Sequence, residues 1–193
     1  MTQRNTFARH LSATLSATLM TVWVCLGAGM EAVTVTAPEY AIKAVFLYNL
    51  LKHTEWPPES ALSDPSRPVV LAVIGEDPFG AALDKAVRGR TVRSRRIVVI
   101  RSSEVQTLKS AHVAFISASA SGRAVELVNA LSALSVLTVG DSVATASAGV
   151  AVNFIMVEGR VRLDVNQGAA RSRHIELSSQ LLKLARRVLE PEG

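Results

Sequence analysis

The chain has 193 residues, a length that suits one domain. Hydrophobic residues make up 49% of it and charged residues 19%, which supplies a substantial core and excludes an intrinsically disordered chain. The formal net charge is +5, from 21 Lys and Arg residues against 16 Asp and Glu residues.

Residues 1–37 have the pattern of a secretory signal peptide. Arg4, Arg9 and His10 precede residues 11–29, which carry no charge, and small residues follow. Cleavage between residues 28 and 37 leaves one exported domain, residues 38–193. An uncleaved membrane anchor is the alternative, because an uncharged run of this length can span a bilayer. We favour cleavage, since Ser, Thr and Gly dilute the hydrophobicity of the run.

Cysteine usage fits this interpretation. Cys25 is the only cysteine, and it lies inside the predicted leader. The mature chain would be exported and yet unable to form an internal disulfide. A core of this size does not need one.

The first half of the predicted domain alternates helical and strand patterns. A capping box at Thr36 to Glu39 predicts a helix that runs to about His53 and is ended by Trp56 and the two prolines after it. The apolar, β-branched run at residues 69–74 predicts a buried strand. Asp77 as cap, with proline next, then predicts a helix reaching about residue 87. A strand at 96–100, a short helix at 104–109 and a strand at 112–116 follow.

The second half continues this alternation and then closes with a hairpin. A helix is predicted at 122–134, a strand at 136–139, and a small, polar connection at 141–148. Residues 150–157 are apolar on both alternating faces, which predicts a strand buried on both sides. Glu158 and Gly159 form a two-residue turn into residues 160–165, where Arg160 and Arg162 point outward as on a protected edge strand. The leucine spacing from Leu177 onward predicts a final amphipathic helix to about residue 189.

Strands that alternate with helices imply βαβ units. We therefore predict a three-layer α/β fold, in which a mostly parallel sheet is flanked by helices and carries a C-terminal antiparallel hairpin and a final helix.

The search for catalytic groups finds none. Gly140-Asp141-Ser142 resembles the nucleophile turn of one serine hydrolase family, but the histidine base of that chemistry needs an aspartate three residues before it, and Arg171 stands there before His174. A structural turn is the better interpretation. His53, His112 and His174 have no partners at metal-ligand spacing, so we expect no metal, no cofactor and no enzymatic activity.

Six arginines gather in one segment of the chain. A nucleic-acid surface is one interpretation, but export argues against it, and no aromatic residues interleave for base stacking. A solvated loop and strand edge is favoured, with contact to an acidic partner or lipid headgroups as the alternative. The six are Arg88, Arg90, Arg93, Arg95, Arg96 and Arg101.

Motifs in a fixed order run through nearly all of the predicted domain and resemble YfiR-type periplasmic proteins. They are Phe46-Leu47-Tyr48-Asn49, Glu55-Trp56-Pro57, Gly75-x-Asp77-Pro78-Phe79-Gly80, His112-Val113-Ala114-Phe115-Ile116, Leu137-Thr138-Val139-Gly140-Asp141, and Gly159-x-Val161-x-Leu163-x-x-Asn166 followed by Ala169-Ala170 and Leu177-Ser178-Ser179-Gln180-Leu181-Leu182. One position departs from the family: Ala111 stands where the family often has cysteine, so control through a disulfide cannot be carried over.

The resemblance implies a periplasmic regulator without catalytic activity. Its family binds the periplasmic sensor domain of an inner-membrane diguanylate cyclase and represses the cyclase. Capture by an outer-membrane lipoprotein releases that repression, raises cyclic di-GMP and promotes biofilm. Other members are linked to histidine kinases. The alternative from the residues alone is a small-ligand binding protein that uses the cleft at the strand ends, and the oligomeric state stays open between monomer and homodimer.

Two surface patches are the predicted partner-binding sites. Aromatic residues favour interface centres, and arginine forks suit carboxylates. Core packing is the alternative for Trp56, while the arginines of the second patch are expected to be exposed. The first patch is Tyr48, Glu55 and Trp56, and the second is Arg171, Arg173 and His174 beside Arg160 and Arg162.

Overall fold

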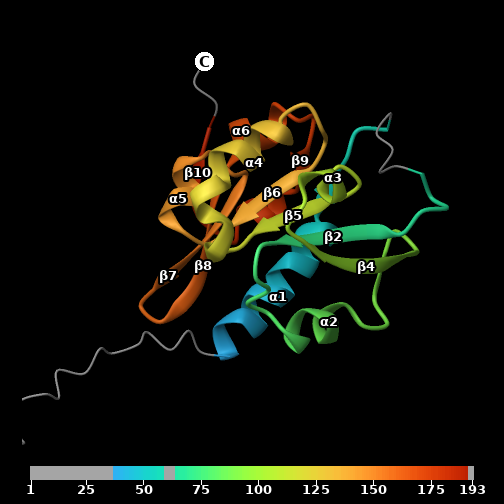
Figure 1. The fold of residues 1–193 in the computed structure, drawn as a ribbon, viewed down its shortest axis with the longest axis horizontal. Helices are drawn as coiled ribbons and strands as arrows, with labels where there is room; N and C mark the ends of the chain where they lie inside the picture. The colour runs from blue at the N-terminus through green and yellow to red at the C-terminus, as the bar shows by residue number, and fades with distance from the viewer. Residues whose placement is uncertain (1–36, 59–63, 191–193) are drawn as a thin grey trace, which may run out of the picture. The chain divides into compact units, whose positions relative to one another are not determined.

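The structure, a computed structural model, describes residues 37–58 and 64–190. The predicted leader and its cleavage site, and the predicted cap at Thr36, lie outside these residues. The described part is built on an eight-stranded sheet in the order β10-β8-β7-β6-β5-β2-β4-β3 (Figure 1). The strands are β2 (Val69–Ile74), β3 (Thr91–Val92), β4 (Arg95–Ser102), β5 (Val113–Ile116), β6 (Leu137–Gly140), β7 (Val152–Val157), β8 (Arg160–Asn166) and β10 (Ala185–Leu189).

Most of this sheet is parallel. β4, β2, β5, β6 and β7 run in one direction, β8 is antiparallel to β7, and β10 pairs parallel with β8. A separate two-stranded antiparallel sheet joins β1 (Thr54–Glu55) to β9 (Glu176–Leu177). The predicted fold class, with its parallel sheet between helices and its C-terminal hairpin, is confirmed.

Helices cover both faces and create two cores. The helices are α1 (Ala37–Lys52), α2 (Ala81–Val87), α3 (Val105–Leu108), the 3-10 helix η2 (Ala118–Arg123), α4 (Ala124–Ala130), α5 (Val143–Ser147), α6 (Gln167–Arg171) and α7 (Ser179–Leu182). Strand β2 contributes to both cores, since Leu71 packs with α1 and α2 while Ala72 packs with α3 and α4. Both faces of β2 are therefore buried, which is why its sequence is apolar without interruption.

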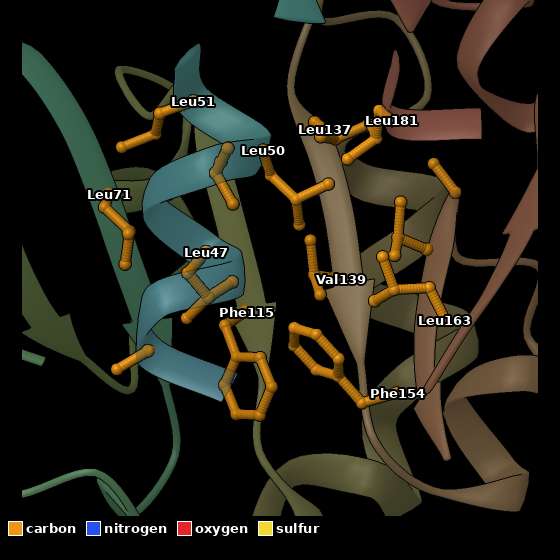
Figure 2. Close-up of a cluster of buried hydrophobic side chains, with 14 of the residues drawn as sticks. Leu47, Leu50, Leu51, Leu71, Phe115, Leu137, Val139, Phe154, Leu163 and Leu181 are labelled. Atoms are coloured by element: carbon orange, nitrogen blue, oxygen red, sulfur yellow. The ribbon is translucent and has the colours of Figure 1, made fainter. Parts of the chain in front are cut away.

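Helix α1 lies in the larger core. Its buried Leu47, Leu50 and Leu51 belong to one cluster with Phe115 of β5 and Phe154 of β7, whose ring centroids lie 6.4 Å apart. Leu47 lies nearest these rings, and Leu51 lies toward the other end of the helix (Figure 2). One helix thus packs against side chains from strands across the middle of the sheet.

The predicted final helix is wrong. Ser178 caps the short helix α7, which ends at Leu182, and the chain then extends as β10 beside β8. In β10, Ala185 and Val188 pack toward the larger core. The leucine spacing of this segment suits a helix, but the hydrogen bonds of residues 185–189 to β8 stabilise a strand more strongly. β8 is therefore an interior strand rather than the predicted edge.

The end of helix α1 agrees with the prediction, and two other boundaries differ. Helix α1 ends at Lys52 and β1 follows it, so Trp56 lies outside the helix that carries Tyr48. Helix α2 begins at Ala81 rather than at Pro78, because the Asp77 carboxylate accepts a hydrogen bond from the Phe79 amide and holds a turn. The helix predicted at 122–134 is split between η2 and the shorter α4.

Two segments near the hairpin also need correction. The connection at 141–148 contains α5, whose start is fixed by a reciprocal capping box between Ser142 and Thr145. Strand β7 is buried on both faces only in its first half, since Met156 is exposed. The hairpin turn itself is confirmed: Glu158 has φ 50° and Gly159 has φ 71°.

Candidate functional site

The β1–β9 pair brings part of the two predicted patches together. Glu55 of β1 lies directly opposite Glu176 of β9, and the Ser178 amide donates to the His53 carbonyl. The segment that carries Arg171 and His174 immediately precedes β9. We call the described residues Glu55, Trp56, Arg171, His174 and Glu176 the amino-end surface, because they lie near the amino ends of the parallel strands.

Two observations place this surface at that end. The Trp56 ring meets the edge of the His112 ring at 5.4 Å, and His112 immediately precedes β5. Helix α6 follows β8, and β8 runs opposite to β7, so it also ends near the start of β7. The Asn166 amide, which donates to the Ala151 carbonyl at 2.8 Å, confirms that closeness.

Trp56 is half-buried beside a cavity of about 170 Å³. Its indole Nε1 is buried and has no hydrogen-bond partner among the described residues. His112 forms part of the same wall: its Nδ1 accepts a hydrogen bond from the Val70 amide at 3.0 Å, and its Nε2 lies 3.3 Å from Nη2 of Arg95. His112 is therefore a packed residue, as predicted. Trp56 packs on it at the edge of the core and is half-exposed to solvent.

Tyr48 and the basic segment have partners within the chain. The Arg90 guanidinium lies over the Tyr48 ring at 4.7 Å, a cation–π contact. Arg101 pairs with Asp77 at 2.6 Å and with Asp84 at 2.8 Å. Arg90 and Arg101 thus have partners within the chain, while Arg88 and Arg96 are exposed, which favours the interpretation of a solvated strand edge.

Arg173 does not lie on the surface, which corrects the prediction of an exposed donor. Its side chain is 5% exposed and donates to the Ala169 carbonyl at 2.7 Å and the Val128 carbonyl at 3.3 Å. Burial lowers the pKa of this guanidinium. Arg171 and His174 beside it are exposed, and Arg171 pairs loosely with Glu190 at 3.4 Å.

Arg160 and Arg162 lie elsewhere, at the opposite end of the sheet. The register pairs Arg160 with Val157 and Arg162 with Ile155, while Met156 pairs with the core residue Val161. Both arginines thus point away from the face that α1 covers, and the structure does not bring them to Arg171 and His174.

Sequence reasoning missed two arginines that accompany them. Arg186 and Arg187 of β10 both bind the Asp164 carboxylate of β8, on the same face as Arg162. Hydrogen bonding from Arg186 is the main cause that lowers the pKa of Asp164 below its ordinary value. The predicted helix hid this arrangement, and the register shift between Ala185 and Arg187 removes the strict alternation that could have revealed a strand.

The Gly-Asp-Ser sequence forms a structural turn, as predicted. Ser142 caps α5, and the buried Asp141 carboxylate accepts from Tyr40 and Lys43, each at 2.8 Å. Burial, followed by the hydrogen bond to Asp141, raises the pKa of Tyr40. Lys43 also pairs with Glu39, so this network joins α1 to the carboxyl end of β6.

Two serine hydroxyls lie against the backbone at the strand ends. The sheet order changes direction between β2 and β5, where such folds bind ligands at the carboxyl ends. A Cβ at Gly75 would lie 2.5 Å from Ser117 Oγ and 2.6 Å from Ser119 Oγ, and Ser119 Oγ accepts from the Glu76 amide. The close approach of these hydroxyls requires glycine at position 75.

Metal-ligand clusters and membrane-spanning helices are both absent from residues 37–58 and 64–190. No group of three His, Cys, Asp or Glu residues in this range could hold a metal ion. No helix in the same range is long and apolar enough to cross a membrane.

Comparison with known proteins gives one match by sequence. A family model described as YfiR/HmsC-like matches residues 40–186. A search of the curated proteins found no match.

Two solved structures align with part of this chain at low identity. The ABC domain from Streptococcus pneumonia in complex with L-Trp aligns at 12% identity and a TM-score of 0.48, covering 76% of this chain and 60% of that one. A conserved domain protein from Vibrio cholerae aligns at 12% identity and a TM-score of 0.49, covering 75% of this chain and 60% of that one. The chain thus spans about 60% of the length of each.

Proposed function

The chain belongs to the YfiR/HmsC-like family, and we propose that it is exported to the periplasm, where it binds and represses the periplasmic sensor domain of an inner-membrane diguanylate cyclase. At the level of the family, the chain is a periplasmic regulator of cyclic di-GMP signalling, and the family is regulatory rather than catalytic. The observation that carries the proposal is the extent of the match, which includes α1, the whole parallel sheet and the start of β10.

Features of the site support binding rather than turnover. The one serine with a catalytic sequence context caps α5. The amino-end surface instead offers exposed charges of both signs around a half-buried tryptophan, a composition common in protein interfaces. Its exposed members Glu55, Arg171 and His174, with Trp56, are our proposed partner contacts there. Tyr48 lies in the last part of α1, which ends at Lys52, and its ring is covered on one side by Arg90.

A direct binding experiment tests this function. The mature chain, residues 38–193, is titrated against the isolated periplasmic domains of the membrane diguanylate cyclases from its own organism, and deletion of its gene is expected to raise cellular cyclic di-GMP and biofilm. Arg171→Ala is expected to weaken binding by about 2 kcal/mol, or roughly thirtyfold, if it is an interface hot spot. Ser142→Ala is the matched control and should bind normally.

The same experiment separates the alternatives. Binding to the sensor domain of a histidine kinase, with no cyclase domain bound, would assign the chain to kinase control. Loss of cyclic di-GMP control in Ser142→Ala, with Arg171→Ala unaffected, would reopen an enzymatic function. An outer-membrane lipoprotein that releases the repression is expected to compete with the cyclase domain for the mature chain.

A further inference from the structure

The outer face of the C-terminal part of the sheet carries four arginines. Arg160 and Arg162 project from β8, and Arg187 lies across from Asp164 in the neighbouring β10, with Arg186 beside it at a register shift. We call Arg160, Arg162, Arg186 and Arg187 the arginine face. It exists because residues 185–189 form a strand and not a helix.

Helices cover only the inner part of this face. The Thr145 hydroxyl of α5 donates to Asn153 of β7 at 2.8 Å, and Asn153 lies directly opposite Asp164. Beyond Asn153, Ile155 and Val157 are half-buried, and the arginines opposite them are exposed. The β7–β8 hairpin projects beyond α4 and α5 (Figure 1), so the outer part of the face is open.

One carboxylate already binds here and shows which ligand the face accepts. Arg186 holds Asp164 with two parallel hydrogen bonds, Nε to Oδ1 at 2.9 Å and Nη2 to Oδ2 at 2.6 Å, and Arg187 adds a third at 3.0 Å. The Asp164 side chain is 12% exposed, and both of its oxygens accept from these arginines. Within the described chain, Arg160 and Arg162 pair with no carboxylate.

We propose that the arginine face binds an acidic surface of the signalling partner. Arg160 and Arg162 make the contacts, while Arg186 and Arg187 stay paired with Asp164 and add to the positive potential of the face. This rests on the proposed function and names the chemistry of the partner. Residues two apart on a strand lie about 6.6 Å apart on one face, which sets two guanidinium forks for two neighbouring carboxylates.

A protein surface fits better than lipid headgroups. The exposed apolar side chain of the hairpin, Met156, lies on the opposite face with Val161. The apolar residues beside the arginines, Ile155 and Val157, are half-buried and level with the strand surface. Exposed Leu189 of β10 lies on this face too, but opposite Asn166, at the other end of β8 from Arg160. Beside Arg160 and Arg162 the described face therefore has no exposed long apolar side chain to enter a bilayer. Arginines around flat apolar residues are typical of protein interfaces.

The test compares two variants of equal charge change. Arg160→Glu/Arg162→Glu reverses the open pair, and Arg88→Glu/Arg96→Glu reverses two exposed arginines near the other edge of the sheet. Each mature protein is titrated with the cyclase sensor domain that binds the wild type, with a hexaglutamate peptide, and with vesicles of phosphatidylethanolamine and phosphatidylglycerol at 3:1. Circular dichroism checks folding, and Arg160→Gln/Arg162→Gln supplies a milder change if the reversal unfolds the hairpin.

We expect the β8 reversal to lose at least tenfold in affinity for the sensor domain and for hexaglutamate, and the wild-type affinities to fall with added salt. The Arg88/Arg96 variant should keep most of the affinity. Equal losses in the two variants, normal sensor binding by the β8 variant, or β8-dependent binding to vesicles alone would each overturn the proposal. If no sensor domain binds the wild type, the proposed function fails, and the hexaglutamate titration still decides the chemistry of the face.

Discussion

Arg173 is a buried charged side chain that links two segments of the fold. Its guanidinium crosses from the turn after α6 to the Val128 carbonyl in α4, and a second hydrogen bond reaches the Ala169 carbonyl. It thus ties the segment that carries Arg171 and His174 to a helix of the opposite layer. Its contribution to the amino-end surface is positional, since it holds exposed neighbours in place.

We predict that Arg173→Ala destabilises the protein by about 2 kcal/mol or more, because two buried carbonyls lose their donor. This corresponds to a fall in Tm of roughly 4–8 °C for a domain of this size. Arg171→Ala removes an exposed side chain with a loose ion pair, and its Tm should stay close to that of the wild type. Thermal unfolding followed by circular dichroism measures both, and equal melting of the two variants would contradict the assignment.

Asp164 gives a prediction in the acid range. Its pKa is lowered in the folded state chiefly by hydrogen bonding from Arg186, so the stabilisation is present above the ordinary pKa of 3.8 and is lost as pH falls through the lower folded value. Arg186→Ala should raise the pKa of Asp164 and flatten the loss of stability below about pH 4. Carboxyl NMR titration measures the pKa directly. Arg187→Ala should shift it less, because Arg187 contributes less than Arg186.

Secondary structure could be predicted from the sequence where the local pattern and the tertiary contacts agree. The strands at 69–74, 112–116 and 160–165 are of this kind, since β-branched runs or clean alternation coincide with sheet pairing. The β3–β4 hairpin was missed because its turn residues, Arg93 and Ser94, adopt positive φ without glycine or asparagine. The arginine face and the burial of Arg173 could not be predicted, because both depend on which distant strand or helix is adjacent.

The β7–β8 turn allows a prediction about a single element. Glu158 has φ 50°, a left-handed conformation that costs an L-residue about 1–2 kcal/mol, while asparagine tolerates it better. Glu158→Asn should therefore raise the unfolding free energy by about 0.5–1 kcal/mol. Chemical denaturation measures this change. Gly159→Ala should lower it by about 1 kcal/mol through the backbone alone, because no atom lies within 4 Å of the added Cβ.

At the scale of the molecule, the sheet is held by apolar packing on both faces and by the β1–β9 pair. The larger core draws buried side chains from α1, from α2 and from strands across the sheet, and the smaller core fills the opposite face under α3 and α4. Charged contacts add connections at the edges of these layers, as in the Lys43–Asp141 pair. Stability thus comes from burial and does not need a cross-link.

We therefore expect the purified mature protein to unfold at the same temperature with and without reductant. The basis is that no cysteine follows Cys25 in the chain. Differential scanning calorimetry of residues 38–193, with and without dithiothreitol, measures the transition. A reproducible shift of several degrees would show that a different group in the protein is redox-active.

The β1–β9 pair also has a consequence for the motions of the amino-end surface. Thr54 and Leu177 are more than a hundred residues apart in sequence, and the pair that joins them is only two residues long. Opening this short ladder breaks few hydrogen bonds, because the pair has only two residue positions. Amide protons of β1 and β9 should therefore exchange with deuterated water faster than those of β2 and β5, through local openings that leave the cores intact. A partner that contacts Glu55 and His174 at the same time would make these local openings less frequent. Its binding should therefore slow the hydrogen exchange of the Thr54 and Leu177 amides.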